Sequence, residues 1–101
     1  MVKILLCCSA GMSTSLMVNK MQAAAEAKGI EAEIWAVPEA EAANEAPKAD
    51  CILLGPQVRF LLDKIKGVAG DTPVEVIDMV AYGMMNGEKV LEQGLKLIGH
   101  E

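Results

Sequence analysis

Apolar and polar residues along the chain form four units, each a strand pattern followed by a helix pattern. Apart from one lysine, residues 2–7 are continuously apolar, and so are residues 51–54. Such runs are typical of strands buried on both faces. Residues 30–37 alternate between apolar and polar, and residues 74–77 are interrupted by Glu75. We therefore expect 2–7 and 51–54 to be central strands of a sheet and the other two segments to be edge strands.

Helical periodicity fills the segments between these strands. The first two expected helices cover 13–28, ended by Gly29, and 38–46, ended by Pro47. The third follows Gly55-Pro56 and ends at Gly67, and its apolar face consists of Val58, Leu61, Leu62 and Ile65. The fourth begins at the cap Asn86 and continues through Ile98. In the first helix the expected apolar stripe consists of Leu16, Met17, Met21, Ala24 and Ala25.

Strands that alternate with helices through short loops indicate a parallel sheet with helices on both faces. With the two wholly apolar strands in the centre, the expected strand order is 2-1-3-4. We therefore expect residues 1–101 to form a single α/β domain. In this order the chain winds in opposite directions from the first and third strands, and ligand sites lie at the carboxyl ends of strands at such a switch point.

Composition and charge narrow the function classes. The chain has 101 residues and a formal net charge of −5, so we expect one domain that does not bind nucleic acid. No apolar run approaches the ~20 residues of a membrane span, and the apolar start is too short for a signal peptide. These features predict a cytoplasmic protein. The three cysteines and single histidine, His100, suit neither a disulfide framework nor a zinc site, and we expect no metal or organic cofactor.

The segment after the first strand carries the candidate chemistry. It begins with a cysteine and is otherwise mostly small or hydroxylated; its residues are Cys8, Ser9, Ala10, Gly11, Met12, Ser13, Thr14 and Ser15. Backbone amides of such a loop can turn inward around an oxyanion, and the N-terminus of the following helix adds free N–H groups. The same groups stabilise a thiolate. The alternative is an ordinary strand–turn–helix connection with a buried, unreactive cysteine.

Three cysteines compete for the role of nucleophile. Successive strand residues face opposite ways, so one of Cys7 and Cys8 enters the sheet packing and the other emerges near the loop. Five residues separate Cys8 from Thr14, as in the Cys-x5 phosphate loop. We therefore favour Cys8 as the nucleophile, and expect Cys7 and Cys51 to be unreactive core residues.

The loop resembles the active loop of phosphotransferase system (PTS) IIB proteins of the lactose, cellobiose and chitobiose class. The likeness continues through Ala49-Asp50-Cys51-Ile52-Leu53-Leu54-Gly55-Pro56-Gln57-Val58 and Pro73-Val74-Glu75-Val76-Ile77-Asp78. It implies a fold like that of low-molecular-weight tyrosine phosphatases. It also implies that Cys8 takes phosphate from a phosphohistidine on the IIA component. Cys8 would then donate the phosphate to a sugar, such as cellobiose or chitobiose, held by the membrane IIC component, and we expect a monomer that meets both partners transiently.

Further residues are expected at the rim of this site. Gln57 is a candidate contact for the phosphoryl group, or a solvated residue opening a helix. Asp78 either orients loop hydroxyls or caps the turn that follows it. Five pliable apolar residues are expected to lie in rim loops: Met12, Val80, Tyr82, Met84 and Met85. They suit a docking face for two partners, or fold back on the core. Trp35 is expected to be structural cover.

Three other functions use related features. A low-molecular-weight tyrosine phosphatase needs an arginine where this chain has Thr14, and an Asp-Pro loop, and the only arginine here is Arg59. An arsenate-reductase-like redox protein needs a resolving cysteine within reach, whereas Cys7 is expected to point away from Cys8. A simple anion-binding module would explain the loop but not a cysteine at its edge.

Overall fold

A computed structural model describes residues 1–8 and 12–99. Ser9, Ala10, Gly11 and His100, which the sequence analysis singled out, lie outside the described residues. Four parallel strands form one sheet in the order β2-β1-β3-β4, which confirms the predicted order. The strands are β1 (Val2–Cys8), β2 (Ala32–Pro38), β3 (Cys51–Leu54) and β4 (Val74–Val76).

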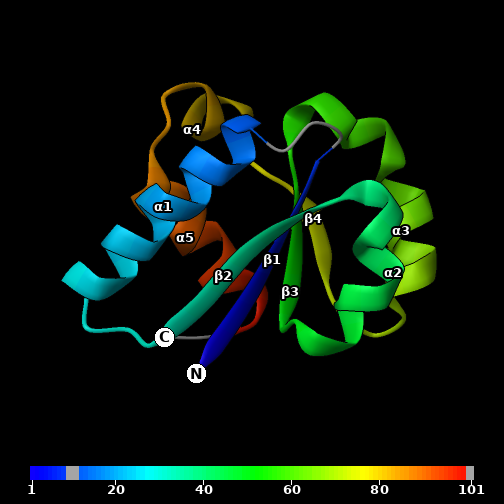
Figure 1. The fold of residues 1–101 in the computed structure, drawn as a ribbon, viewed down its shortest axis with the longest axis horizontal. Coiled ribbons are helices and arrows are strands. Elements are labelled where there is room, and N and C mark those ends of the chain that lie inside the picture. The colour runs from blue at the N-terminus through cyan, green and yellow to red at the C-terminus, as the bar shows by residue number, and fades with distance from the viewer. Residues whose placement is uncertain (9–11, 100–101) are drawn as a thin grey trace.

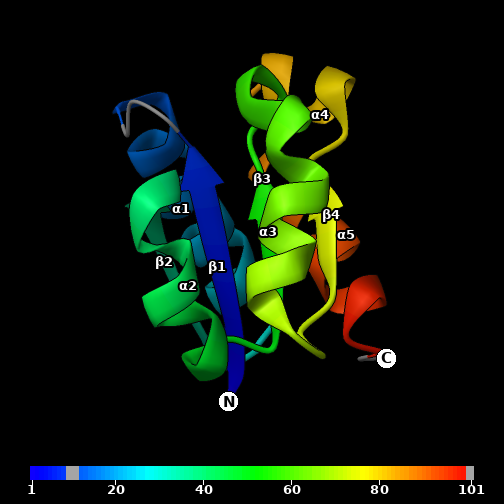
Figure 2. The same cartoon turned by 90° about the vertical axis from the view of Figure 1, so that its right-hand side faces the viewer.

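Helices cover both faces of the sheet, as predicted (Figure 1). One face carries α1 (Met12–Ala27) and α5 (Gly87–Leu97), which pack against each other. The other face carries η1 (Glu39–Glu41), α2 (Ala42–Glu45), η2 (Ala46–Lys48), η3 (Pro56–Leu61) and α3 (Leu62–Ala69). A short helix, α4 (Met79–Gly83), lies at the end of the sheet to which the strands point (Figure 2).

The hydrophobic core is divided by the sheet because neighbouring strand residues face opposite ways. On β1, Ile4 and Leu6 pack towards α1 and α5, whereas Leu5 and Cys7 pack towards α2 and α3. All of these side chains are fully buried. Two apolar faces explain why the central strands read as continuous hydrophobic runs rather than alternating ones.

Two predicted helix boundaries are wrong. The segment expected to be one helix over 38–46 is a succession of short helices that continues past Pro47, which lies in the first turn of η2, where its missing N–H costs no hydrogen bond. Likewise, α3 continues through Gly67 and ends at Ala69. The residue after it, Gly70, has φ 64°, a conformation that glycine adopts without the strain of a side chain.

Two further differences concern the carboxyl end of the sheet. The apolar residues after Asp78 were expected to lie in loops, but residues 79–83 form α4. In α1, the predicted core residue Leu16 is exposed, whereas Met17, Met21 and Ala25 are fully buried. The predicted cap of α5 is confirmed, since Asn86 Oδ1 accepts a hydrogen bond from Lys89 N at 3.1 Å.

Within residues 1–8 and 12–99, every helix is too short or too polar to cross a lipid bilayer.

Candidate functional site

Cys8 is the last residue of β1 and lies at the predicted switch point. The chain passes from β1 to α1 on one face of the sheet and from β3 to η3 and α3 on the other. The carboxyl ends of the two central strands therefore meet where their connections diverge. Cys8 is buried there, with 1% of its surface exposed.

A long helix, α1, begins four residues after Cys8. Of the expected phosphate-binding residues, Ser9, Ala10 and Gly11 lie outside the described part of the chain, and α1 already begins at Met12, one residue earlier than predicted. The first N–H groups of a helix have no partner within it. Ser13, Thr14 and the exposed Ser15 thus lie in the first turn of α1, five to seven residues after Cys8.

Gln57 and Tyr82 meet beside Cys8, although 25 positions separate them in the sequence. Gln57 Nε2 donates a hydrogen bond to the Tyr82 hydroxyl at 3.3 Å. The Gln57 side chain also lies over Gly55, where a Cβ atom would meet Gln57 Oε1 at 2.6 Å and Cys8 Cβ at 3.6 Å. Glycine thus lets the carboxamide approach the end of β3, next to the cysteine.

Asp78 caps α4. Its Oδ2 accepts a hydrogen bond from Ala81 N at 2.9 Å, and its backbone carbonyl accepts one from Tyr82 N at 2.9 Å. Of the two roles considered for Asp78, this geometry shows the capping role. The cap sets the start of the helix that carries Tyr82.

Exposed apolar side chains surround this end of the molecule. Met79 and Val80 on α4, Met84 just after it and Phe60 on η3 have between 56% and 78% of their surfaces exposed, and Leu16 on α1 has 47%. Met85 and Tyr82 instead pack against the core. The docking alternative thus fits Val80 and Met84, whereas Met85 folds back on the core. We call the exposed set the apolar rim; it consists of Leu16, Phe60, Met79, Val80 and Met84.

The other two cysteines are core residues, as expected. Cys7 and Cys51 are fully buried, and Cys51 Sγ donates to Gly94 O at 3.7 Å. Burial, aided by the adjacent Cys8 and by Glu39, raises the pKa of Cys7 to about 11. Burial, with smaller effects from Asp50 and Glu75, raises the pKa of Cys51 to about 12. Neither sulfur forms a thiolate readily at neutral pH.

These raised pKa values predict a loss of stability at alkaline pH. The folded state binds the Cys51 proton more tightly than the unfolded state, whose thiol keeps the ordinary pKa of 9.0. This contribution is complete below pH 9 and is lost as the pH rises towards 12. We expect the free energy of unfolding, measured by denaturant titration, to fall less between pH 8.5 and pH 11 in Cys51→Ala than in the wild type. Equal falls would contradict the assignment.

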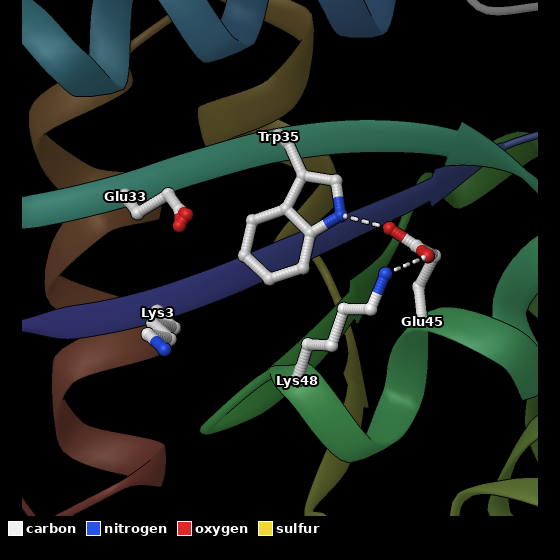
Figure 3. A pocket seen from close by; sticks show the side chains of 5 residues that line it. All are labelled: Lys3, Glu33, Trp35, Glu45 and Lys48. Atoms are coloured by element: carbon white, nitrogen blue, oxygen red, sulfur yellow. Dashed lines mark hydrogen bonds and ion pairs between the residues drawn. The ribbon is translucent and has the colours of Figure 1, made fainter.

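A hollow of about 340 Å3 lies elsewhere, beside the amino-terminal half of β1 (Figure 3). Trp35 Nε1 donates to Glu45 Oε1 at 3.0 Å, and Lys48 Nζ donates to Glu45 Oε2 at 3.0 Å. Lys3, which lines the hollow, and Cys8 are five residues apart on one strand, so their Cα atoms lie roughly 16 Å apart. The half-buried Trp35 packs against the core and ties β2 to α2, which is the structural role expected for it.

A sequence model of the family described as "PTS system, Lactose/Cellobiose specific IIB subunit" matches residues 3–93. The chain belongs to this family. It is therefore a phosphotransferase system IIB component, part of a machinery for sugar uptake. The family that the sequence resembles is confirmed.

Relatives of known specificity agree with this assignment. The oligo-beta-mannoside-specific EIIB component of Bacillus subtilis is 52% identical over 100 residues, covering 97% of each chain. Galactose-specific and cellobiose-specific EIIB components of Lactococcus lactis are each 47% identical over 95 residues, covering 87% of this chain and 88% of theirs. As EIIB components are phosphotransferases, the reaction class is a group transfer.

Solved IIB structures share the fold. The cellobiose-specific IIB component of Borrelia burgdorferi superposes with a TM-score of 0.80 at 37% identity, covering 96% of this chain and 91% of that one. The lactose-specific IIB domain of Streptococcus pneumoniae superposes with a TM-score of 0.84 at 18% identity, covering 95% and 96%. At that lower identity the likeness concerns the fold alone.

Sequence reasoning missed two features of this end of the IIB domain. The first is the exposed Phe60. It lies off the helical stripe of the buried Val58 and the half-buried Leu61, and that position is the sequence signal that could have placed it at the surface. The contacts of Gln93 with the corner between β4 and α4 had no sequence signal, because a polar residue on an amphipathic helix normally faces solvent.

Proposed function

We propose that this IIB component carries a phosphoryl group on Cys8 between a phosphohistidine of the IIA component and a sugar bound by the membrane IIC component. It would act as a protein-phosphocysteine–sugar phosphotransferase, as a cytoplasmic monomer recruited transiently to the transporter. The observation that carries the proposal is the place of Cys8 at the switch point, four residues before the start of α1.

Two displacements at phosphorus make up the reaction. In the first, the Cys8 thiolate attacks the phosphorus of a phosphohistidine whose other ring nitrogen carries a proton. An S–P bond forms, the N–P bond breaks and neutral imidazole leaves with the electron pair. In the second, a sugar hydroxyl oxygen attacks, so that an O–P bond forms and the cysteine leaves as a thiolate. The hydroxyl proton passes to a base on the transporter side.

Positioning and anion stabilisation supply the catalysis in this proposal. Backbone N–H groups of residues 9–15 surround the phosphoryl oxygens, and the positive end of the α1 dipole attracts them. Gln57 and Tyr82, joined beside Cys8, form one side of the site, and Asp78 fixes α4 behind them. The family assignment and the geometry beside Cys8 support these roles.

The apolar rim supports transient docking. Its side chains are exposed on three elements around one end of the sheet, and apolar patches of this kind mark interaction sites. Flexible methionines suit a surface that must fit two partners in turn. Because Cys8 is buried in the isolated chain, we expect docking of the phosphorylated IIA component to open a path to the sulfur.

The proposed substrate class follows the names of the relatives. They act in systems specific for oligo-beta-mannosides, galactose and cellobiose. We propose a β-linked disaccharide or short oligosaccharide, held by IIC.

Measurement of the intact mass of the protein tests the proposal. The protein is incubated with phosphoenolpyruvate, the general PTS proteins and a IIA component, then analysed without acid treatment. We expect the mass of one phosphoryl group to be gained, and no gain when the IIA component is omitted. A protein that stays unmodified, or that hydrolyses aryl phosphates unaided, would refute the carrier function.

A further inference from the structure

The Gln93 side chain on α5 is hydrogen-bonded to the edge of the sheet. Its Oε1 accepts a hydrogen bond from Asp78 N at 2.8 Å, and its Nε2 donates to Val76 O at 2.8 Å. The same Nε2 contacts Glu75 Oε1 at 2.5 Å. β4 is the edge strand, so no further strand offers partners to these backbone groups. The carboxamide of Gln93 takes the place of that missing strand.

Only a carboxamide suits this position. The two backbone groups need one acceptor and one donor, and glutamine provides both on a single planar group. A glutamate would still accept from Asp78 N, but it would face the Val76 carbonyl with no proton to donate. It would also stand beside Glu75 as a second negative charge.

The segment that Gln93 holds leads into α4. Ile77, the residue just after β4, donates its N–H to Leu54 O at 2.8 Å, and this bond connects the corner to the end of β3. The next residue, Asp78, has its N–H held by Gln93 and its carboxylate on Ala81 N. The direction in which α4 leaves the sheet is therefore set from both sides of Asp78.

This helix serves the proposed site in two ways. Tyr82 accepts the hydrogen bond from Gln57 beside Cys8. Met79 and Val80 belong to the apolar rim, with 56% and 68% of their surfaces exposed. A change in the direction of α4 would displace both the rim and the tyrosine relative to the sulfur.

We propose that Gln93 is a positioning residue for phosphoryl transfer, which orients α4 and its part of the docking surface by satisfying the backbone at the β4–α4 corner. The inference rests on the proposed function. Gln93 itself is on α5 and acts through Asp78 and α4, so its loss should weaken the encounter with the phosphorylated IIA component more than the transfer step itself.

The test compares Gln93→Glu and Gln93→Ala with Gln22→Glu. Gln22 is a matched control, because its Nε2 also donates to a strand carbonyl, Ala32 O at 3.1 Å, but on β2 at the opposite edge of the sheet. Initial rates of transfer from phosphorylated IIA are measured by intact mass over a range of IIA concentrations. For both Gln93 variants we expect the half-saturating IIA concentration to rise about tenfold, which corresponds to the loss of one hydrogen bond. The maximal rate should stay within about twofold of the wild-type rate.

A second readout does not depend on phosphoryl transfer. Amide hydrogen exchange in residues 79–83 should be about tenfold faster in Gln93→Glu than in the wild type, and unchanged in Gln22→Glu. Unaltered exchange in this segment, or a IIA dependence equal to that of the control, would overturn the positioning role. A wild-type protein that accepts no phosphate would instead refute the proposed function, while the exchange measurement would still decide whether Gln93 holds α4.

Discussion

Replacing Cys8 by serine is expected to abolish coupled sugar phosphorylation, with a fall on the order of 10³-fold or more. A serine hydroxyl remains protonated at neutral pH and is a poor nucleophile and leaving group compared with a thiolate. The measurement is the formation of sugar phosphate by membranes that contain the IIC component, with purified IIA, phosphoenolpyruvate and the general PTS proteins.

Cys7→Ser is the matched control, because it makes the same atomic change one residue away. The Cys7 side chain packs in the core between β1 and the helices α2 and α3. A buried hydroxyl there should cost roughly 1–3 kcal/mol of stability but leave the transfer reaction in place. Activity lost equally in both variants would point to a shared folding defect, and activity kept in Cys8→Ser would contradict the role of Cys8.

Gly87→Ala is expected to destabilise the fold by about 3 kcal/mol. Gly87 opens α5 where it crosses α1, and a Cβ atom there would lie 2.5 Å from the Lys20 carbonyl carbon and 2.6 Å from its oxygen. Because the obstructing atoms are backbone, the two helices must move apart to admit a methyl group. Denaturant unfolding monitored by circular dichroism measures the loss.

Gly67→Ala is expected to raise the free energy of unfolding, measured in the same way. Gly67 lies inside α3, and nothing lies within 4 Å of a Cβ atom placed there. Alanine should therefore stabilise the helix by roughly 0.5–1 kcal/mol. Equal effects of the two substitutions would show that the contact between α1 and α5 is looser than described.

The strands and their order could be predicted because a strand buried on one face alternates apolar and polar residues, and a strand buried on both faces is apolar throughout. The run Cys51–Leu54 is apolar throughout, and it is a central strand. Short helices cannot be predicted from the apolar pattern in this way. Residues 79–83 form little more than one turn, too short for a helical period to repeat, and α4 exists because Asp78 caps it. The sequence places Leu16 on the apolar stripe of α1, but at the start of that helix it is left exposed.

The candidate site was predictable only as far as its local chemistry. Cys8 and the small residues after it are contiguous, so their pattern can be read directly from the sequence. The meeting of Gln57 with Tyr82, and of Gln93 with Asp78, is created by the sheet, which brings the ends of β3, β4 and α5 together. No spacing rule connects residues 25 or 15 positions apart on different elements.

The chemical linkage of the transferred phosphate tests the central claim most directly. The protein is phosphorylated through IIA at neutral pH and examined by phosphorus-31 NMR, with Cys8→Ser and Cys7→Ser treated in parallel. We predict a resonance in the thiophosphate region, present in Cys7→Ser and absent from Cys8→Ser. A phosphate bound to nitrogen or to a hydroxyl oxygen, or a thiophosphate that persists in Cys8→Ser, would contradict Cys8 as the phosphoryl carrier.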